Sequence, residues 1–186
     1  MNTVTYNGLN FRPYIKYETI QRRIAEIGEE IGHEYSGKCP LILCVLTGAF
    51  PFASDLFRSL GIDAEIAFIR LKSYEGTSTT GNVKQLLGLT ENIEGRHVII
   101  VEDIVDTGHT ISNLIKDLQA RNPASVKVAT LLYKPQAQLC GVVPDYVGFE
   151  IPTKFIIGFG LDLDGLARNL RDIYVICDED KLSTQE

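Results

Sequence analysis

One stretch of the sequence, residues 98–111, constrains the fold more than any other. It reads VIIVEDIVDTGHTI, and its first four residues are apolar and mostly β-branched, which is typical of a strand buried on both faces. Two carboxylates, Glu102 and Asp103, follow directly, and a third, Asp106, precedes a short hydroxyl-rich loop. From Ile111 onward apolar residues recur at helical spacing. The pattern predicts a strand, an acidic turn, a loop and a helix, as in an open α/β sheet.

The loop after this strand has the composition of an anion site. In open α/β sheets, ligands bind beyond the carboxyl ends of the strands, which is where this loop is expected. A helix that begins after it presents free backbone N–H groups and the positive end of its dipole, both of which suit a phosphate. Gly108 lets the backbone approach a ligand closely, and the hydroxyls of Thr107 and Thr110 add donors.

The three carboxylates admit a functional and a purely structural interpretation. Beside a phosphate, Glu102 and Asp103 would repel the ligand unless a cation intervened, so they indicate hydrated Mg²⁺ or ribose hydroxyls. Asp106 is then placed to act as a general base. In the structural alternative, Glu102 and Asp103 are turn residues and Asp106 or Thr107 only caps the helix. The complete string in this context favours the functional interpretation.

Composition limits the class of protein and of partner. With 186 residues, of which 45% are hydrophobic and 23% charged, the chain should form one domain. The net charge of −6 argues against a nucleic-acid partner. The four cysteines are widely spaced, no apolar run is long enough to span a bilayer, and the first residues lack a signal-peptide pattern. We therefore expect a cytoplasmic protein without a nucleic-acid or membrane partner; the acidic balance does not argue against phosphorylated small molecules, which need only local positive groups.

The remaining chain alternates strand and helix patterns. A strand of residues 41–46 ends at Thr47 and Gly48, a second candidate anion turn, before a helix that Pro51 opens. A strand of residues 125–133 ends at Lys134, on the sheet edge expected for Asp106. The other predicted elements are an amphipathic helix at 16–35, strands at 64–71, 85–89 and 173–177, and a polar segment at 72–81 that is either a disordered crossover or a lid.

Residues 98–110 resemble the phosphoribosyl-diphosphate (PRPP) loop of type I phosphoribosyltransferases. The order Glu-Asp, two apolar residues and Asp-Thr-Gly resembles the 6-oxopurine branch, the hypoxanthine(-guanine) phosphoribosyltransferases. Motifs similar to this branch occur at six places, in order, between about residues 41 and 177. The resemblance implies the type I phosphoribosyltransferase fold, a central parallel sheet flanked by helices. It implies a single domain over 1–186, with a core at about 16–135, a small hood formed from the N-terminal segment and about 140–180, and a flexible flap at about 72–88.

The resemblance also implies a role for individual residues. PRPP and its 5′-phosphate would be bound by Glu102, Asp103, Ile104, Val105, Asp106, Thr107, Gly108, His109 and Thr110, with Asp106 as the catalytic base. Pyrophosphate would be bound by Thr47, Gly48 and Arg168. The purine would be bound by Lys134, Phe155, Ile156 and Asp162, under a lid of Ser73 and Tyr74. Mg²⁺ would be held by Glu102, Asp103 and Asp162.

Two residues depart from the family pattern. Many members carry Lys or Arg at the position of Thr47, so this turn would bind pyrophosphate through backbone N–H groups alone. An aromatic residue usually stands at the position of Leu163.

The implied activity is a Mg²⁺-dependent transfer of the 5-phosphoribosyl group from PRPP to N9 of hypoxanthine, and of guanine, in purine salvage. The family also implies a homodimer or homotetramer. Xanthine as the substrate is a remaining alternative, and a PRPP-sensing regulatory protein is a second one. Adenine is disfavoured, because its 6-amino group is a donor that would face the donor Lys134.

Overall fold

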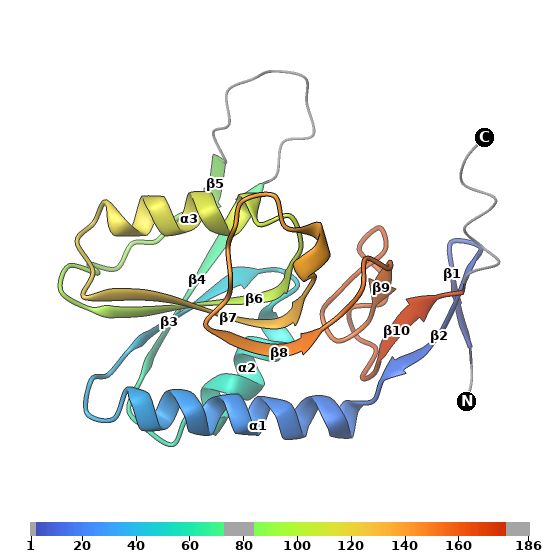
Figure 1. Cartoon of the computed structure of the whole chain (residues 1–186), viewed down its shortest axis with the longest axis horizontal. Coiled ribbons are helices and arrows are strands. Elements are labelled where there is room, and N and C mark those ends of the chain that lie inside the picture. The colour runs from blue at the N-terminus through green and yellow to red at the C-terminus, as the bar shows by residue number, and fades with distance from the viewer. Residues whose placement is uncertain (1–2, 73–83, 178–186) are drawn as a thin grey trace.

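The fold is that of a computed structural model, which describes residues 3–72 and 84–177 (Figure 1). The predicted lid residues Ser73 and Tyr74, most of the predicted flap, and the polar tail from Asp178 lie outside these described residues. The described strands form two sheets, one of six strands and one of four.

The six-stranded sheet is the centre of the molecule. Five of its strands are parallel, and β5, at one edge, is antiparallel to β4. In spatial order the strands are β5 (Lys84–Leu87), β4 (Glu65–Lys72), β3 (Leu41–Leu46), β6 (His97–Val105), β7 (Ser125–Tyr133) and β8 (Tyr146–Glu150). The alternating strands and helices of the sequence therefore give the parallel α/β sheet that was expected.

Helices cover both faces of this sheet (Figure 1). α1 (Tyr17–Glu34) and α2 (Phe50–Ser59) pack on one face, and α3 (His109–Gln119) packs on the other. Successive residues of β3 divide between them: Ile42 belongs to the hydrophobic cluster of α1 and α2, whereas Leu43 belongs to the cluster of α3. This division is the physical reason why the strand is continuously apolar in the sequence.

The four-stranded sheet joins the two ends of the chain. It is antiparallel, in the order β1 (Val4–Tyr6), β2 (Leu9–Ile15), β10 (Ile173–Ile176) and β9 (Ile156–Ile157). It lies at one end of the molecule, and a separate cluster around Phe11 and Ile157 forms its core (Figure 1). The N-terminal segment and the segment after residue 140 thus lie side by side. The division into core, hood and flap stays a prediction.

The prediction that the strand ends in an acidic turn after residue 101 is wrong about where the strand ends. β6 does not end at Val101 but continues to Val105, so Glu102 and Asp103 lie within the strand. The cause is β7, which pairs with β6 up to Tyr133: Glu102 lies opposite Thr130 and Val105 opposite Tyr133. The strand therefore carries its carboxylates rigidly, and the loop begins only at Asp106.

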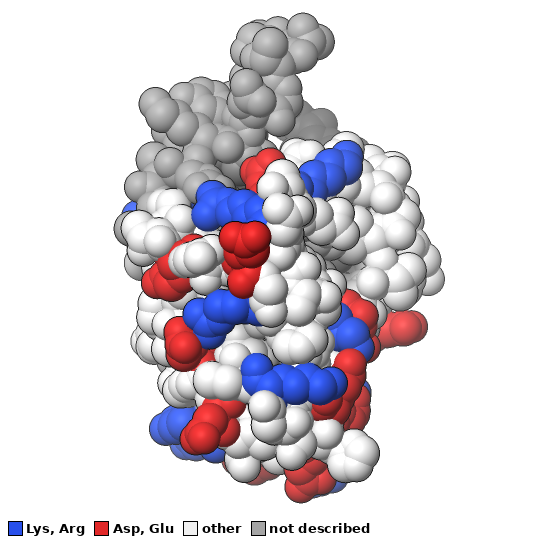
Figure 2. All heavy atoms as spheres, turned by 90° about the vertical axis from the view of Figure 1, so that its left-hand side faces the viewer, with Lys and Arg blue, Asp and Glu red and all other residues white. Residues whose placement is uncertain are grey.

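A face on the left of Figure 1 is shown turned toward the viewer in Figure 2. Lys and Arg side chains are interspersed there with Asp and Glu side chains. The described residues of this face form no continuous basic stripe of the kind that follows a nucleic-acid backbone.

A glycine contact between α1 and α2 provides a test of this packing. A Cβ atom at Gly32 would lie 2.2 Å from the backbone oxygen of Leu60, at the end of α2. In an ordinary helix a Gly-to-Ala change stabilises by about 1 kcal/mol. Gly32→Ala should instead lower the unfolding free energy by about 1–3 kcal/mol, because the helices must separate. Urea unfolding measures this, with the exposed Glu29→Ala as a control; an unchanged or higher stability of Gly32→Ala would contradict the packing.

Candidate active site

The site is built at the carboxyl edge of the parallel sheet, where the end of β3 lies beside the last part of β6. These strands pair in register from Leu41 opposite Val98 to Cys44 opposite Val101. The turn of Thr47 and Gly48 follows β3, and the peptide bond between Leu46 and Thr47 is cis. A Cβ atom at Gly48 would lie 1.6 Å from Oδ2 of Asp103 and 3.2 Å from Nη1 of Arg168. The turn therefore packs directly on these two side chains, and only glycine fits there.

Arg168 and Asp162 reach the same turn from the C-terminal part of the chain. Nη1 of Arg168 donates to the backbone oxygen of Gly160 at 2.6 Å, and Nη2 lies 2.7 Å from Oδ1 of Asp162. The other oxygen of Asp162 accepts from the backbone N–H of Gly165 at 2.7 Å. A Cβ atom at Gly160 would lie 2.0 Å from the backbone oxygen of Gly48. The structure thus brings together all three residues predicted to bind pyrophosphate.

The two carboxylates of β6 are held in an environment that disfavours their charge. Oε2 of Glu102 is buried and has no hydrogen-bond partner among the described residues. Burial, and then the neighbouring Asp103, raise the pKa of Glu102 well above its usual value. Burial also raises the pKa of Asp103 to about 6, although the Ile104 N–H and the Arg168 charge oppose this. Two adjacent carboxylates with an unpartnered oxygen suit a hard cation.

The described residues do not enclose a metal ion on their own. Within 3–72 and 84–177, no group of three or more His, Cys, Asp and Glu side chains is arranged to hold one. Asp162, the third predicted ligand, has its carboxylate bonded to Arg168 and Gly165. The donor set therefore fits an ion that keeps much of its water shell, rather than one in a protein cage.

Residues 102–110, which are the last four residues of β6, the loop after it and the first residues of α3, form a small cavity; we call this stretch loop 102–110. Gly108 has a left-handed backbone (φ 85°) and is the N-cap of the helix, so His109 is the first helical residue. A cavity of about 90 Å³ is lined by Glu102, Ile104, Val105, Asp106, Thr107, Gly108, Thr110 and Ile111. Of the nine residues predicted to bind PRPP, seven thus line one space, and Asp103 and His109 do not line it.

Lys134 and Asp106 form an ion pair at the same edge. Nζ of Lys134 lies 2.9 Å from Oδ2 of Asp106, and the backbone N–H of Lys134 donates to the oxygen of Val105 at 3.0 Å. The Lys134 side chain is only 11% exposed, whereas the Asp106 side chain is 45% exposed. A rigidly held cation therefore lies beside an accessible carboxylate; the shared sheet edge was predicted from the sequence, whereas the ion pair was not.

The remaining predicted purine residues come from the second sheet. Phe155 is 45% exposed, and its ring centroid lies 6.2 Å from that of Phe11. Ile156 is buried and pairs with Val175 in the small sheet. The backbone oxygen of Phe155 accepts from the N–H of Ile176 at 3.0 Å. Phe155 thus offers an open aromatic face, whereas the Ile156 side chain belongs to the core.

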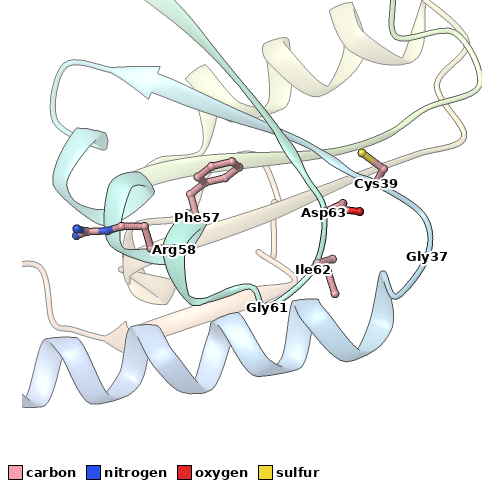
Figure 3. A pocket seen from close by; sticks show the side chains of 7 residues that line it. All are labelled: Gly37, Cys39, Phe57, Arg58, Gly61, Ile62 and Asp63. Atoms are coloured by element: carbon pink, nitrogen blue, oxygen red, sulfur yellow. The ribbon is translucent and has the colours of Figure 1, made fainter.

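A second hollow lies at the opposite, amino edge of the sheet (Figure 3). It has a volume of about 620 Å³ and lies between the ends of α1 and α2 and the starts of β3 and β4. Arg58 points away from Cys39 in Figure 3 and is paired with Asp55. The hollow is lined by Gly37, Cys39, Phe57, Arg58, Gly61, Ile62 and Asp63. The ionisable side chains that line this hollow are Cys39, Arg58 and Asp63, and Arg58 is already paired with Asp55.

Comparisons with known proteins decide the family. Residues 16–164 match the phosphoribosyl transferase domain family. A hypoxanthine-guanine phosphoribosyltransferase of Streptococcus thermophilus is 42% identical over 163 residues, which cover 87% of this chain and 91% of the relative. The chain belongs to the hypoxanthine-guanine phosphoribosyltransferase family.

Other members of this family agree with the assignment. A hypoxanthine-guanine-xanthine phosphoribosyltransferase of Tritrichomonas foetus is 44% identical over 160 residues, covering 86% of this chain and 87% of the relative. A solved hypoxanthine phosphoribosyltransferase of Staphylococcus aureus superposes with a TM-score of 0.88 at 35% identity, over 97% of this chain and 98% of that chain. The family and the fold class predicted from the sequence are confirmed.

Sequence reasoning missed one contact of this phosphoribosyltransferase site. Nε2 of Gln138 donates to the backbone oxygen of Asp106 at 2.5 Å. Gln138 lies in the irregular connection between β7 and β8, just after the short 3₁₀ helix η1 (Pro135–Ala137). No periodicity or motif marks a glutamine in such a segment, so nothing in the sequence singled it out.

The helices that the structure describes are not membrane-spanning in character. Across residues 3–72 and 84–177, no helix combines the length and the apolar composition that a membrane-spanning segment requires.

The raised pKa of Asp103 predicts a pH-dependent gain in stability when its charge is removed. Its pKa is about 6 in the folded chain and near 3.8 without the fold. The folded state therefore binds the proton more tightly, and the unfolding free energy falls as pH rises from about 4 through 6. Asp103→Asn should raise the unfolding free energy by about 1–3 kcal/mol at pH 7.5 and by little near pH 4.

Thermal unfolding of the free protein at both pH values measures this effect. Asp117→Asn, at an exposed position of α3, is the matched control and should change stability little at either pH. A loss of stability at pH 7.5 in Asp103→Asn would contradict the electrostatic account of this site.

Proposed function

We propose that this chain transfers the 5-phosphoribosyl group from PRPP to N9 of hypoxanthine, and of guanine, releasing pyrophosphate. The observation that carries the proposal is the Lys134–Asp106 pair, 2.9 Å apart, next to the cavity of loop 102–110. A cation and a carboxylate beside an anion site are the groups that a purine acceptor and a ribosyl phosphate donor require. Family membership supports the same reaction.

The 5′-phosphate of the donor binds the loop at the start of α3. The N–H groups of the first helical turn and the hydroxyls of Thr107 and Thr110 donate to it, and the helix dipole favours its charge. This phosphate is remote from the reacting carbon. Its binding energy therefore serves to position the anomeric carbon, C1′, rather than to bind the substrate alone.

Mg²⁺ would be held, with much of its water shell, by Glu102, Asp103 and Asp162. The unpartnered, buried Oε2 of Glu102 and the raised pKa of Asp103 support a bound cation, because a neighbouring positive charge offsets the cost of ionising both groups. When bound, the ion neutralises negative charge on the pyrophosphate and so lowers the barrier to its departure.

The leaving pyrophosphate is bound by the turn after β3 and by Arg168. Thr47 carries no charge, so the turn contributes backbone N–H groups of Thr47 and Gly48. The guanidinium of Arg168, already placed by Gly160 and Asp162, adds the positive charge. The negative charge that develops on the leaving pyrophosphate is thus stabilised by N–H groups and a guanidinium that are already in position.

The purine is bound between Lys134 and the aromatic ring of Phe155. O6 and N7 lie on one edge of a 6-oxopurine, so Nζ of Lys134 donates to O6 while Asp106 accepts the proton from N7. N9 bonds to C1′ while the bond from C1′ to the pyrophosphate oxygen breaks, and positive charge develops on the purine. Transfer of the N7 proton to Asp106 removes this charge. Phe155 stacks on the ring, and the backbone of Ile156 binds the opposite edge.

Three further properties remain predictions from family membership. A homodimer or homotetramer is expected, and so is a cytoplasmic location. A lid of Ser73 and Tyr74, outside the described residues, would exclude water from the ribosyl cation.

Xanthine is the second candidate acceptor. The 44% identity to the Tritrichomonas foetus enzyme, which is named for hypoxanthine, guanine and xanthine, supports testing it. Lys134 would read O6 of all three bases in the same way, so discrimination must occur at C2. A regulatory protein that senses PRPP would show no transfer to any base.

An assay with each base separates these functions. Purified protein with Mg²⁺ and PRPP is offered hypoxanthine, guanine, xanthine and adenine in turn, and pyrophosphate release is measured. We expect release with hypoxanthine and guanine and none with adenine. Release with xanthine alone would establish the second candidate, and no release with any base would contradict the proposed function.

Asp106→Asn tests the assignment of the base. The amide keeps the size of the side chain but cannot accept the N7 proton, so kcat should fall on the order of a hundred-fold or more. Asp106→Asn also removes the counter-charge of the largely buried Lys134, so the unfolding midpoint should fall, and kcat is measured well below that midpoint, where the variant is folded. The exposed Asp117→Asn serves as the matched control and should keep full activity. Near-normal kinetics in Asp106→Asn would show that another group removes the proton.

A further inference from the structure

Three successive backbone carbonyls of loop 102–110 are bonded to one segment of the chain. The segment is residues 134–142, the connection after β7, which we call the bracket. The oxygen of Val105 accepts from the N–H of Lys134 at 3.0 Å, and that of Thr107 accepts from the N–H of Leu139 at 3.0 Å. Between them, the oxygen of Asp106 accepts from Nε2 of Gln138 at 2.5 Å. Gln138 therefore donates this hydrogen bond from its side chain, whereas Lys134 and Leu139 donate theirs from backbone N–H groups.

The side chain of Gln138 is itself held at both ends. Its Oε1 accepts from the backbone N–H of Val142 at 3.2 Å, so the amide group is fixed between the bracket and the loop. A Cβ atom at Gly108 would lie 2.7 Å from this oxygen. Gln138 thus packs against Gly108 at the start of α3 and also donates a hydrogen bond to the backbone oxygen of Asp106.

The direction of a carbonyl decides the direction of the next N–H group. In a trans peptide unit the C=O of one residue and the N–H of the next lie in one plane and point in opposite directions. The bond from Gln138 to the Asp106 oxygen therefore turns the N–H of Thr107 away from the bracket. Thr107 and Gly108 line the cavity of the loop, where the phosphate is expected.

We propose that Gln138 is a positioning residue for PRPP. It orients the middle peptide unit of the loop so that the Thr107 N–H faces the 5′-phosphate. This inference rests on the proposed function, since the phosphate is that of the ribosyl donor. It assigns Gln138 an effect on the donor and none on the recognition of the purine.

Gln138→Glu removes the bond to the loop with the least other change. The carboxylate has the same length and can still accept from Val142, but it cannot donate to the Asp106 oxygen. We expect the KM for PRPP to rise roughly ten-fold or more, from the lost and replaced hydrogen bond. The KM for hypoxanthine should change less than about two-fold, because Gln138 bonds the backbone oxygen of Asp106 and not the side chains of Asp106 and Lys134, which contact the purine.

Gln136→Glu is the matched control. It places the same charge two positions away, on an exposed residue of η1, and should leave the KM for PRPP unchanged. Gln138→Met, which is uncharged and of similar length, should also raise the KM for PRPP. This second variant decides the question if Gln138→Glu does not fold.

Hydrogen exchange supplies a readout that does not depend on turnover. Amides of residues 104–110 should exchange faster in Gln138→Met than in the unaltered protein, whereas amides of β3 should not change. A KM for PRPP within two-fold of normal in the folded Gln138 variants would overturn the proposal. So would equal rises in both KM values. Absence of turnover in the unaltered protein would instead contradict the proposed function.

Discussion

The parallel pairing of β3 with β6 is the interaction on which the rest of the structure depends. It is buried on both faces, with residues such as Ile42 packed under α1 and α2 and Leu43 packed under α3. Because the strands are parallel and in register, the turn after β3 meets the carboxylates of β6 at one edge. Gly48 can pack on Asp103 only through this pairing. The turn of Thr47 and Gly48 and the loop at α3 are therefore placed by the core itself.

The carboxylates at this edge of the sheet lower the stability of the free protein. Glu102 has a buried oxygen without a hydrogen-bond partner in the described part of the chain, and burial raises the pKa of Asp103 to about 6, so ionising both is unfavourable in the free protein. The neighbouring positive charge, Arg168, is shared with Asp162. Groups arranged in this way are stabilised by a cationic ligand and destabilised without one. Such a local conflict with packing is expected at functional sites rather than in structural turns.

Most of the central sheet could be predicted from the sequence because its signals are local. The continuous apolar run of residues 41–46 and the helical spacing after Ile111 each reflect burial of that segment alone. The position of Lys134 beside Asp106 also followed, since carboxyl ends of parallel strands share one edge. The motifs then identified the family, which the comparisons confirmed.

Other features depend on contacts between distant segments and could not be predicted. β6 extends through Glu102 and Asp103 because β7 continues to pair with it, and no pattern within residues 98–105 reveals that partner. The bond of Arg168 to Gly160, and its ion pair with Asp162, arise in an irregular segment without periodicity. The contact of Gln138 with Asp106 joins residues of two different connections. In each case tertiary packing, rather than local preference, decides the geometry.

The central claim is that a ribosyl phosphate lies across this edge with its phosphate on the loop at α3. A crystal structure of the protein with PRPP and Mg²⁺ tests it most directly. The account predicts the 5′-phosphate within hydrogen-bond distance of the backbone N–H groups of residues 107–110, with the ribose over Glu102 and Asp103. A 5′-phosphate bound elsewhere, with this loop empty, would contradict it.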